Sequence, residues 1–278
     1  MADEDTSSKQ SSYDSTGTCF AANPGKFLVD EYRKILRKVQ DTSPLPRNFP
    51  RQQLFELYVC RTILFAAFTI GIRLGNLSIL YVPISIFGNT FTVTFTYVVI
   101  PIAGLQIIVS YQRGMITMHE MRVLVITWAV LAGMFSEACN INYVLGDSGQ
   151  PTYFMPFLIG ITIQAIGPQY DKDRKMLVGL SVGSAVVAAL TLHAIFDQIT
   201  FATILGLTVS CLNATIALQL CLYDIIHGKV DIELTHVFGI IIAMINHLLV
   251  CRITGRYVDD PSANDISRAM PLRDALHI

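Results

Sequence analysis

Residues 176–196 read MLVGLSVGSAVVAALTLHAIF, and the only ionisable side chain among them is a histidine. A helix needs about 20 apolar residues to cross the hydrocarbon core of a bilayer, and this run has that length. Since lipid offers no hydrogen-bond partners, the backbone of such a run has to satisfy its own polar groups as a helix. Charged residues flank the run, with Lys175 before it and Asp197 after it. The run therefore predicts a transmembrane helix.

Further apolar runs lie on both sides of this one. They cover residues 54–72, 86–110, 121–139, 153–167, 199–223 and 237–251. The whole chain is 52% hydrophobic and 15% charged, whereas soluble domains carry about a quarter charged residues. We therefore predict an all-α, polytopic membrane bundle of about seven transmembrane helices over residues 54–253. The last run is short and contains Asn246 and His247. A full crossing would also place Arg252 and Arg256 on the non-cytoplasmic side, so a tilted or re-entrant segment is expected there.

The regions outside the bundle are polar. Residues 1–25 are rich in Ser, Thr and Asp and are predicted to be a disordered cytoplasmic tail. Residues 26–53 combine a basic amphipathic helix, over 26–41, with a proline-rich linker. That helix lies either on an anionic membrane surface or against the protein's own loops. Residues 254–278 form a polar C-terminal tail.

Lysine and arginine alternate between the two sides of the predicted bundle. They occur before the first run, between the second and third, after the fourth and after the sixth, as Arg47, Arg51, Arg113, Arg122, Lys172, Arg174, Lys175 and Lys229. The connections in between are poor in positive charge. Because basic residues accumulate in cytoplasmic loops, the pattern predicts a cytoplasmic N-terminus.

Two charges fall within or at the end of an apolar run on the predicted cytoplasmic side. Arg61 lies about two turns into the first run, and Asp224 ends the sixth. Ionisable groups are costly in lipid and point to function. The two side chains either form an ion pair, or Arg61 extends to the lipid headgroups.

A second group of ionisable residues lies at the opposite ends of the runs. Glu137 and Asp197, with His193, are candidates for an acidic vestibule that attracts cations, with wetted helix ends as the alternative. His247 is either a pH-sensitive group in the ion pathway or a core histidine bonded to a backbone carbonyl. Gly179 and Gly183 give their run a small-residue face, which we expect to pack within the bundle.

No enzyme signature occurs in the chain. His119 and Glu120 begin a zinc-protease motif, but Val123 stands where the second histidine belongs. The cysteines show no paired spacing, so no metal site is predicted. A net charge of -1 gives no basic footprint for nucleic acid. We expect no enzymatic activity, no catalytic residues and no cofactor.

Several short segments resemble a known membrane family. They are Leu222-Tyr-Asp-Ile-Ile-His227, the apolar stretch Val237 to Leu249 that ends His-Leu-Leu, Arg51-Gln-Gln-Leu-Phe55 with Val59, and Gln169-Tyr-Asp171. Their order is similar to that of the Bax inhibitor-1 (TMBIM) superfamily, especially its Golgi anti-apoptotic branch, over roughly residues 50–253. In its divergence the chain resembles the seven-transmembrane TMBIM-like family of cytomegaloviruses.

The resemblance implies a function and a gate. Superfamily members act as calcium leaks or modulators that protect against cell death, and two aspartates sharing a proton form the proposed gate. Asp224 matches the first aspartate, but Ile240 stands at the second, so the pair is broken. The expected location is the endoplasmic reticulum, the Golgi or another host membrane. The expected partners are the bilayer, calcium ions and host membrane proteins. The alternative is a non-conducting viral immune-evasion protein that diverts host membrane proteins.

Overall fold

The computed structural model describes residues 33, 35–46, 49–75, 89–144, 154–170, 172–196, 199–227 and 232–257. The chain divides into two compact units, Met1–Asp41 and Thr42–Ile278. In the first unit, residues 33 and 35–40 are helical, which agrees with the helix predicted over 26–41. The tail predicted to be disordered and nearly all of the C-terminal tail lie outside the described residues.

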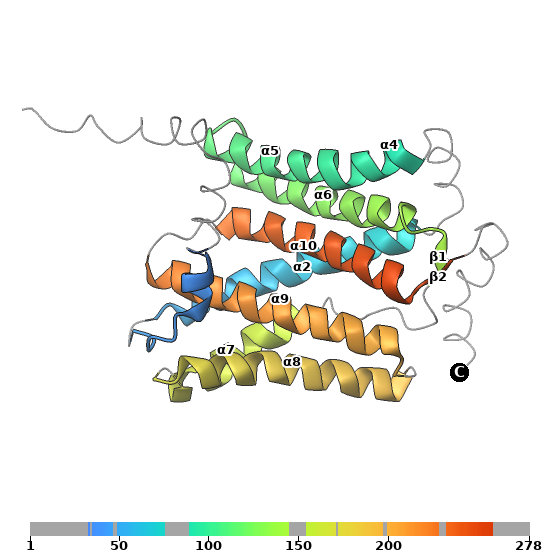
Figure 1. The fold of residues 1–278 in the computed structure, drawn as a ribbon. Coiled ribbons are helices and arrows are strands. Elements are labelled where there is room, and N and C mark those ends of the chain that lie inside the picture. The colour runs from blue at the N-terminus through green and yellow to red at the C-terminus, as the bar shows by residue number, and fades with distance from the viewer. Residues whose placement is uncertain are drawn as a thin grey trace, which may run out of the picture. The chain divides into compact units, whose positions relative to one another are not determined.

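The second unit is a helical bundle (Figure 1). Its elements are α2 (Arg51–Gly75), α4 (Asn89–Thr94), the π-helix η1 (Phe95–Val99), α5 (Ile100–Gln112), α6 (Met118–Ala138), β1 (Tyr143–Val144), α7 (Met155–Tyr170), α8 (Arg174–Phe196), α9 (Phe201–Ile226), α10 (Ile232–Thr254) and β2 (Arg256–Tyr257). Since α4, η1 and α5 follow without a break, each predicted apolar run corresponds to one helical segment. The predicted all-α membrane fold is confirmed, with one short β1–β2 ribbon added.

Six of these helices are long and apolar enough to cross a membrane. They are Arg51–Gly75, Thr90–Gln112, Met118–Ala138, Arg174–Ile195, Phe201–Ile226 and Leu234–Thr254. The described part of the chain is therefore that of a multi-pass membrane protein. The exception is α7, whose 16 residues span about 24 Å at 1.5 Å per residue, less than the hydrocarbon core.

The last segment is longer than its apolar run predicted. The run covered residues 237–251, but α10 has 23 residues and extends beyond both ends. The prediction of a short, doubtful last segment was wrong, because polar residues such as Thr235 and His236 join the helix instead of forming a loop.

Consecutive segments run in opposite directions. The contacts that fix this are Gly75 with Glu137, Gly160 with Tyr58, Thr96 with Phe135, Arg174 with Gln219, and Arg61 with Thr235. As a result α2, α6, α8 and α10 point one way, and α4–α5, α7 and α9 point the other. The two sides of the bundle are named after α2. The N-side is the side on which α2 begins, and the C-side is the side on which α2 ends.

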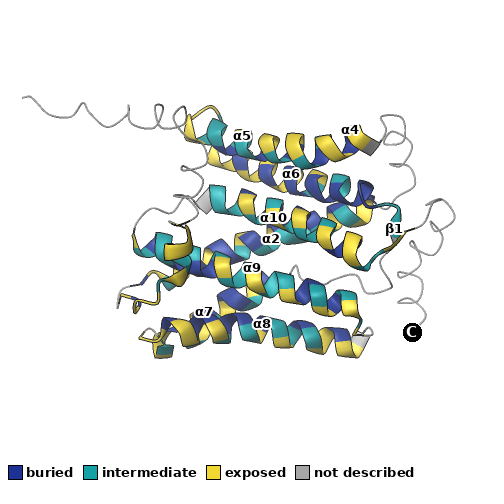
Figure 2. Cartoon of the chain, in the orientation of Figure 1, coloured by how far each residue is buried: buried dark blue, intermediate teal, exposed yellow. Residues whose placement is uncertain are grey.

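Two apolar clusters fill the bundle, and α2 contributes to both. One joins the first half of α2 to α7, α8 and α9, around residues such as Tyr58 and Leu222. The other joins the second half of α2 to η1, α5, α6 and α10, around Phe68 and Trp128. Exposed positions lie along the outer faces of the helices (Figure 2). Many of them are large apolar residues, such as Phe201, which is 70% exposed. Such faces suit contact with lipid rather than water.

Glycines bring α2 and α6 into backbone contact. A Cβ on Gly71 would collide with the carbonyl of Val130, and one on Gly133 with the carbonyl of Phe68. Only helices with small residues at the interface approach this closely.

The small-residue face of α8 behaves differently. A Cβ on Gly179 or Gly183 would meet no described atom within 4 Å, so the prediction that they pack within the bundle was wrong for the part of the chain seen here. The helix is rotated so that Ser181, Ala185 and Ala189 face inward instead.

Candidate functional site

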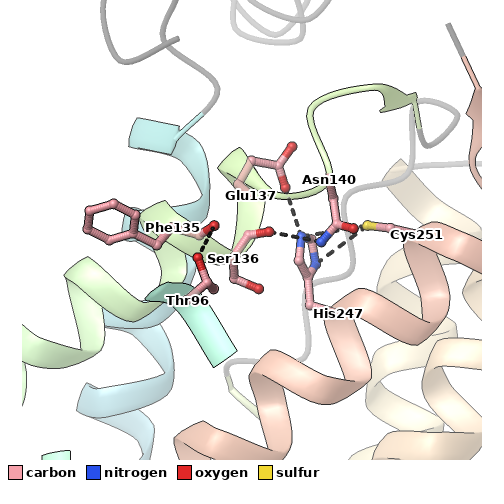
Figure 3. Close-up of polar contacts among 7 residues, drawn as sticks. All are labelled: Thr96, Phe135, Ser136, Glu137, Asn140, His247 and Cys251. Carbon is pink, nitrogen blue, oxygen red and sulfur yellow. Dashed lines mark hydrogen bonds and ion pairs between the residues drawn. The ribbon is translucent and has the colours of Figure 1, made fainter. Parts of the chain in front are cut away.

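A polar cluster lies on the C-side, where three helical segments meet (Figure 3). Its residues are Thr96 and Tyr97 from η1, Ser136 and Glu137 from the end of α6, Asn140 just after α6, and His247 and Cys251 from α10. We refer to these seven residues as the C-side cluster.

The centre of the cluster is a carboxylate–imidazole pair. Oε2 of Glu137 lies 2.8 Å from Nε2 of His247. Both side chains are largely buried, with 11% and 14% of their surface exposed. When His247 is protonated, the contact is an ion pair between α6 and α10, and removing either partner would leave the other exposed to a low-dielectric surrounding.

The local sequence places Glu137 at this position. Thr117 begins α6 with a capping box, in which its hydroxyl accepts from the amide of Glu120 and the Glu120 carboxylate accepts from the amide of Thr117. This fixes the start of the helix. The 21 residues of α6 then carry the chain to the C-side, where Glu137 precedes its last residue.

A π-turn supplies the other wall of the cluster. The amide of Ile100 donates to the carbonyl of Phe95, five residues back, and Pro101 follows with no amide to continue the regular pattern. Thr96 is fully buried there, donates to the carbonyl of Phe135 at 3.4 Å and accepts from the Cys139 thiol at 3.1 Å. Single π-turns inside helices are frequent at functional sites.

Three polar atoms of the cluster have no hydrogen-bond partner among the described residues. They are the hydroxyl of Tyr97, Oγ of Ser136 and Oδ1 of Asn140. The Tyr97 hydroxyl lies close to both of the other residues, while the Asn140 amide donates to the carbonyl of Ser136 at 2.8 Å. Leaving a buried polar atom unpaired costs about 1–3 kcal/mol. The three oxygens belong to the same cluster as the Glu137 carboxylate, and a water or a hard cation is the kind of partner that each of them would accept.

The oxygen set does not amount to a conventional metal centre. No group of three or more His, Cys, Asp or Glu side chains in the described ranges is arranged to hold a metal ion.

The neighbouring cysteine does not complete a nucleophilic triad. Sγ of Cys251 lies 3.6 Å from Nε2 of His247 and 3.9 Å from Nδ1. In a triad the imidazole links nucleophile and acid through opposite nitrogens. Here the thiol and Glu137 both lie nearest to Nε2, so the ring cannot relay a proton between them in this arrangement.

A short ribbon ties together the chain segments that leave the cluster. Tyr143 pairs with Tyr257, and Val144 with Arg256. Nη1 of Arg252 donates to the Tyr143 hydroxyl at 2.6 Å, and the guanidinium lies 4.1 Å from the centre of that ring. The ribbon therefore links the residue stretch after α6 to the end of α10, the two helices that carry Glu137 and His247.

The structure joins two of the predicted site residues that the sequence did not pair. Glu137 was expected beside His193 and Asp197, but its partner is His247 on α10. The backbone-bonded alternative for His247 is excluded, because its ring contacts a carboxylate. His193 is buried in α8, and Asp197 lies outside the described residues, so the acidic vestibule stays a prediction.

Arg61 and Asp224 lie on the N-side. Arg61 is only 6% exposed, so it does not extend to the lipid headgroups. Its Nη2 donates to the carbonyl of Thr235 at 3.3 Å, and its guanidinium lies 5.6 Å from the centre of the Tyr58 ring. Both Arg61 and Asp224 lie near the Cys221 thiol. In the described part of the chain, the contacts of Arg61 do not include the Asp224 carboxylate.

Sequence reasoning missed the neutral members of the cluster. Thr96, Tyr97, Ser136 and Asn140 are common polar residues, and nothing in their spacing marks them. The one available signal was Pro101 inside an apolar run, since proline disturbs the helix before it.

No family model, curated protein or solved structure matches the chain. The fold and the site define its class, a multi-pass α-helical membrane protein with a buried carboxylate–imidazole pair.

Proposed function

We propose that this protein modulates cation flux, with calcium as the physiological ion, and that the C-side cluster forms part of the ion pathway. The observation that carries the proposal is the buried contact between Glu137 and His247, 2.8 Å long, inside a membrane bundle. Ionisable residues in such positions most often mark ion or proton pathways.

The neighbouring atoms explain how a cation would use the pair. The imidazole of His247 occupies one carboxylate oxygen, and a cation that reaches the cluster competes with it for that oxygen. The unpaired oxygens of Tyr97, Ser136 and Asn140 supply further ligands of the kind that calcium prefers. Separation of α6 from α10 would release Glu137, so the pair acts as the closed state of the pathway.

The resemblance to the TMBIM superfamily supports the wider role. It suggests a calcium leak in the endoplasmic reticulum, the Golgi or another host membrane, with an effect on cell death. The basic residues near the N-side favour a cytoplasmic N-side. In place of the superfamily's second aspartate, Ile240 is fully buried in an apolar cluster. The proposed pathway therefore depends on Glu137 and not on two aspartates that share a proton.

Reconstituted protein tests the proposal directly. Purified full chain in liposomes that contain a calcium dye should admit calcium faster than empty liposomes. The Glu137→Gln variant should slow entry by about tenfold, which corresponds to roughly 1.4 kcal/mol of lost cation stabilisation. The matched control is Glu56→Gln, since Glu56 is an exposed carboxylate that contacts Gln52 on the N-side half of α2. Wild-type liposomes no leakier than empty ones would refute the proposal, and an unchanged Glu137→Gln variant would remove the cluster from the pathway.

The outer face of α8 favours a second candidate, a non-conducting protein that diverts host membrane proteins in viral immune evasion. Gly179 and Gly183 leave open space along that face, and Val187 beyond them is 63% exposed. A partner helix can approach closely over such residues. Under this alternative, proximity labelling should recover a host membrane protein, and Gly183→Leu should lose it while Ala103→Leu on exposed α5 surface retains it. Recovery that does not depend on Gly183 would count against this candidate.

A further inference from the structure

A second polar group is buried on the N-side, apart from the C-side cluster. Arg61 projects from α2 towards α10, where its guanidinium contacts the carbonyl of Thr235 and lies beside Gly239. The ring of Tyr58, one turn earlier on α2, lies under the guanidinium. His236, the residue after Thr235, lies close to the positive charge of Arg61.

Three polar atoms of this group are buried without a hydrogen-bond partner in the part of the chain that the structure describes. They are Nε of Arg61, the hydroxyl of Tyr58 and Nδ1 of His236. Tyr58 is 1% exposed and Arg61 6%. The Arg61 Nε and the Tyr58 hydroxyl carry hydrogens to donate, and His236 does so in its Nδ1-protonated tautomer. The group therefore presents up to three donors and one permanent positive charge.

The charge of Arg61 is poorly compensated by its direct contacts. A guanidinium keeps its charge in any protein environment. Its neighbours among the described residues are neutral groups, namely a backbone carbonyl, the ring and hydroxyl of Tyr58, and the Cys221 thiol. The Cys221 thiol of α9 lies next to Arg61, and Asp224, an acidic residue about one turn further along α9, lies near the same thiol. Burying a charge in a bilayer is costly unless an opposite charge accompanies it.

We propose that Tyr58, Arg61 and His236 form a binding site for a small monovalent anion of the chloride type. A single compact ion accepts several N–H and O–H donors at once, and one negative charge balances one guanidinium. The described residues around the Arg61 guanidinium, among them Phe65 and Gly239, add no second permanent cation to balance a doubly charged phosphate. The site is distinct from the cation pathway proposed on the C-side.

Thermal unfolding of the full chain in phosphatidylcholine nanodiscs tests the site. At constant ionic strength, replacing sodium gluconate by sodium chloride should raise the Tm saturably, because a ligand that binds only the folded state stabilises it. Bromide should act like chloride, and sulfate should not. Line broadening of the chloride NMR signal by the protein provides a direct reading of binding.

Variants locate the effect. Arg61→Met should abolish the chloride-dependent rise in Tm, and Tyr58→Phe should raise the half-saturating chloride concentration by about tenfold, as expected for the loss of one hydrogen bond to a charge. Arg73→Met is the matched control, because Arg73 is an exposed arginine at the C-side end of the same helix. It should retain the full chloride effect.

Several outcomes would overturn the site. One is a Tm that does not depend on chloride, and another is an equal chloride effect on the Tm of wild type and Arg61→Met. If Arg61→Met does not fold, an unchanged half-saturating chloride concentration in Tyr58→Phe would also overturn the site. A stabilisation that requires phosphatidylglycerol and not chloride would assign the site to a lipid phosphate instead. The test involves no calcium flux, and Glu137→Gln should keep the chloride effect, so its failure is separable from failure of the cation pathway.

Discussion

The two halves of α2 are packed in different ways. In the second half, Gly71 and Gly75 meet the backbone of α6, and the nearby carboxylate of Glu137 has an imidazole partner. In the first half, contacts are made by side chains, and the direct contacts of Arg61 within the described residues include no group of opposite charge. Backbone contact leaves no room for adjustment, whereas side-chain contact does. The second half is therefore expected to resist substitution, and the first half to accept a ligand.

The largest effect is expected from Gly133→Ala. A Cβ at this position collides with the backbone carbonyl of Phe68, and neither helix can move without separating the whole interface. We expect a loss of about 3 kcal/mol or more, at the upper end of overpacking effects. Fluorescence-detected gel filtration on heating measures the resulting drop in Tm.

Gly239→Ala is the matched control. Gly239 belongs to α10 and lies against the first half of α2. Its Cβ would lie 3.5 Å from Nε of Arg61, an ordinary contact with a flexible side chain. Since alanine favours a helix over glycine by about 0.5–1 kcal/mol, Tm should hold or rise slightly. Equal damage from both variants would show that the two halves do not differ.

His247→Ala should have the next largest effect. It leaves the Glu137 carboxylate without its partner, which we expect to cost about 2–3 kcal/mol unless a proton neutralises it. Adding Glu137→Gln should restore part of the loss, so a double-mutant cycle on Tm should give a coupling of about 1 kcal/mol or more. Strictly additive losses would mean that the contact contributes nothing to stability.

Arg61→Met should change stability little when chloride is absent. Replacing a poorly compensated buried charge by an apolar side chain of similar length is often neutral or stabilising, so we expect a change within about 1 kcal/mol of wild type in gluconate. Unfolding followed by circular dichroism measures it. A loss as large as that of His247→Ala would show that the guanidinium is neutralised inside the protein, with Asp224 as the candidate.

The smallest effect is expected from Arg252→Gln. This change removes the contact between the guanidinium and the Tyr143 ring at the exposed β1–β2 ribbon. A cation–π contact at an exposed site is worth about 0.5–1 kcal/mol. Hydrogen exchange should show faster opening of residues 143–144 while α2 and α6 keep their protection. Faster exchange throughout α6 would instead make the ribbon part of the bundle's core stability.

The sequence located the helices but not their neighbours. The run over residues 176–196 predicted α8 almost to the residue, because length and hydrophobicity alone decide whether a segment can span lipid. The same run misled about packing. Gly179 and Gly183 fit the small-residue pattern, but the buried small residues of α8 are Ser181, Ala185 and Ala189. The rotation of a helix about its axis depends on the helices packed against it. The hydrophobicity of a membrane-spanning run does not specify which helices those are.

The site was predicted in part for the same reason. Glu137 and His247 could be selected singly, since any ionisable residue in an apolar run is costly. Their pairing joins residues that are 110 positions apart, and no local pattern encodes it. The neutral members, such as Tyr97 and Asn140, carried no signal in their own type or spacing.

For this protein, hydrophobicity along the chain by itself determined the membrane class, the helical segments and the residues that are expensive to bury. The tertiary structure alone decided which of those residues meet, which glycines touch a backbone and which donors stay unpaired. The physical reason is that crossing a bilayer is a property of one segment at a time, whereas neutralising a buried charge depends on the relative position of at least two.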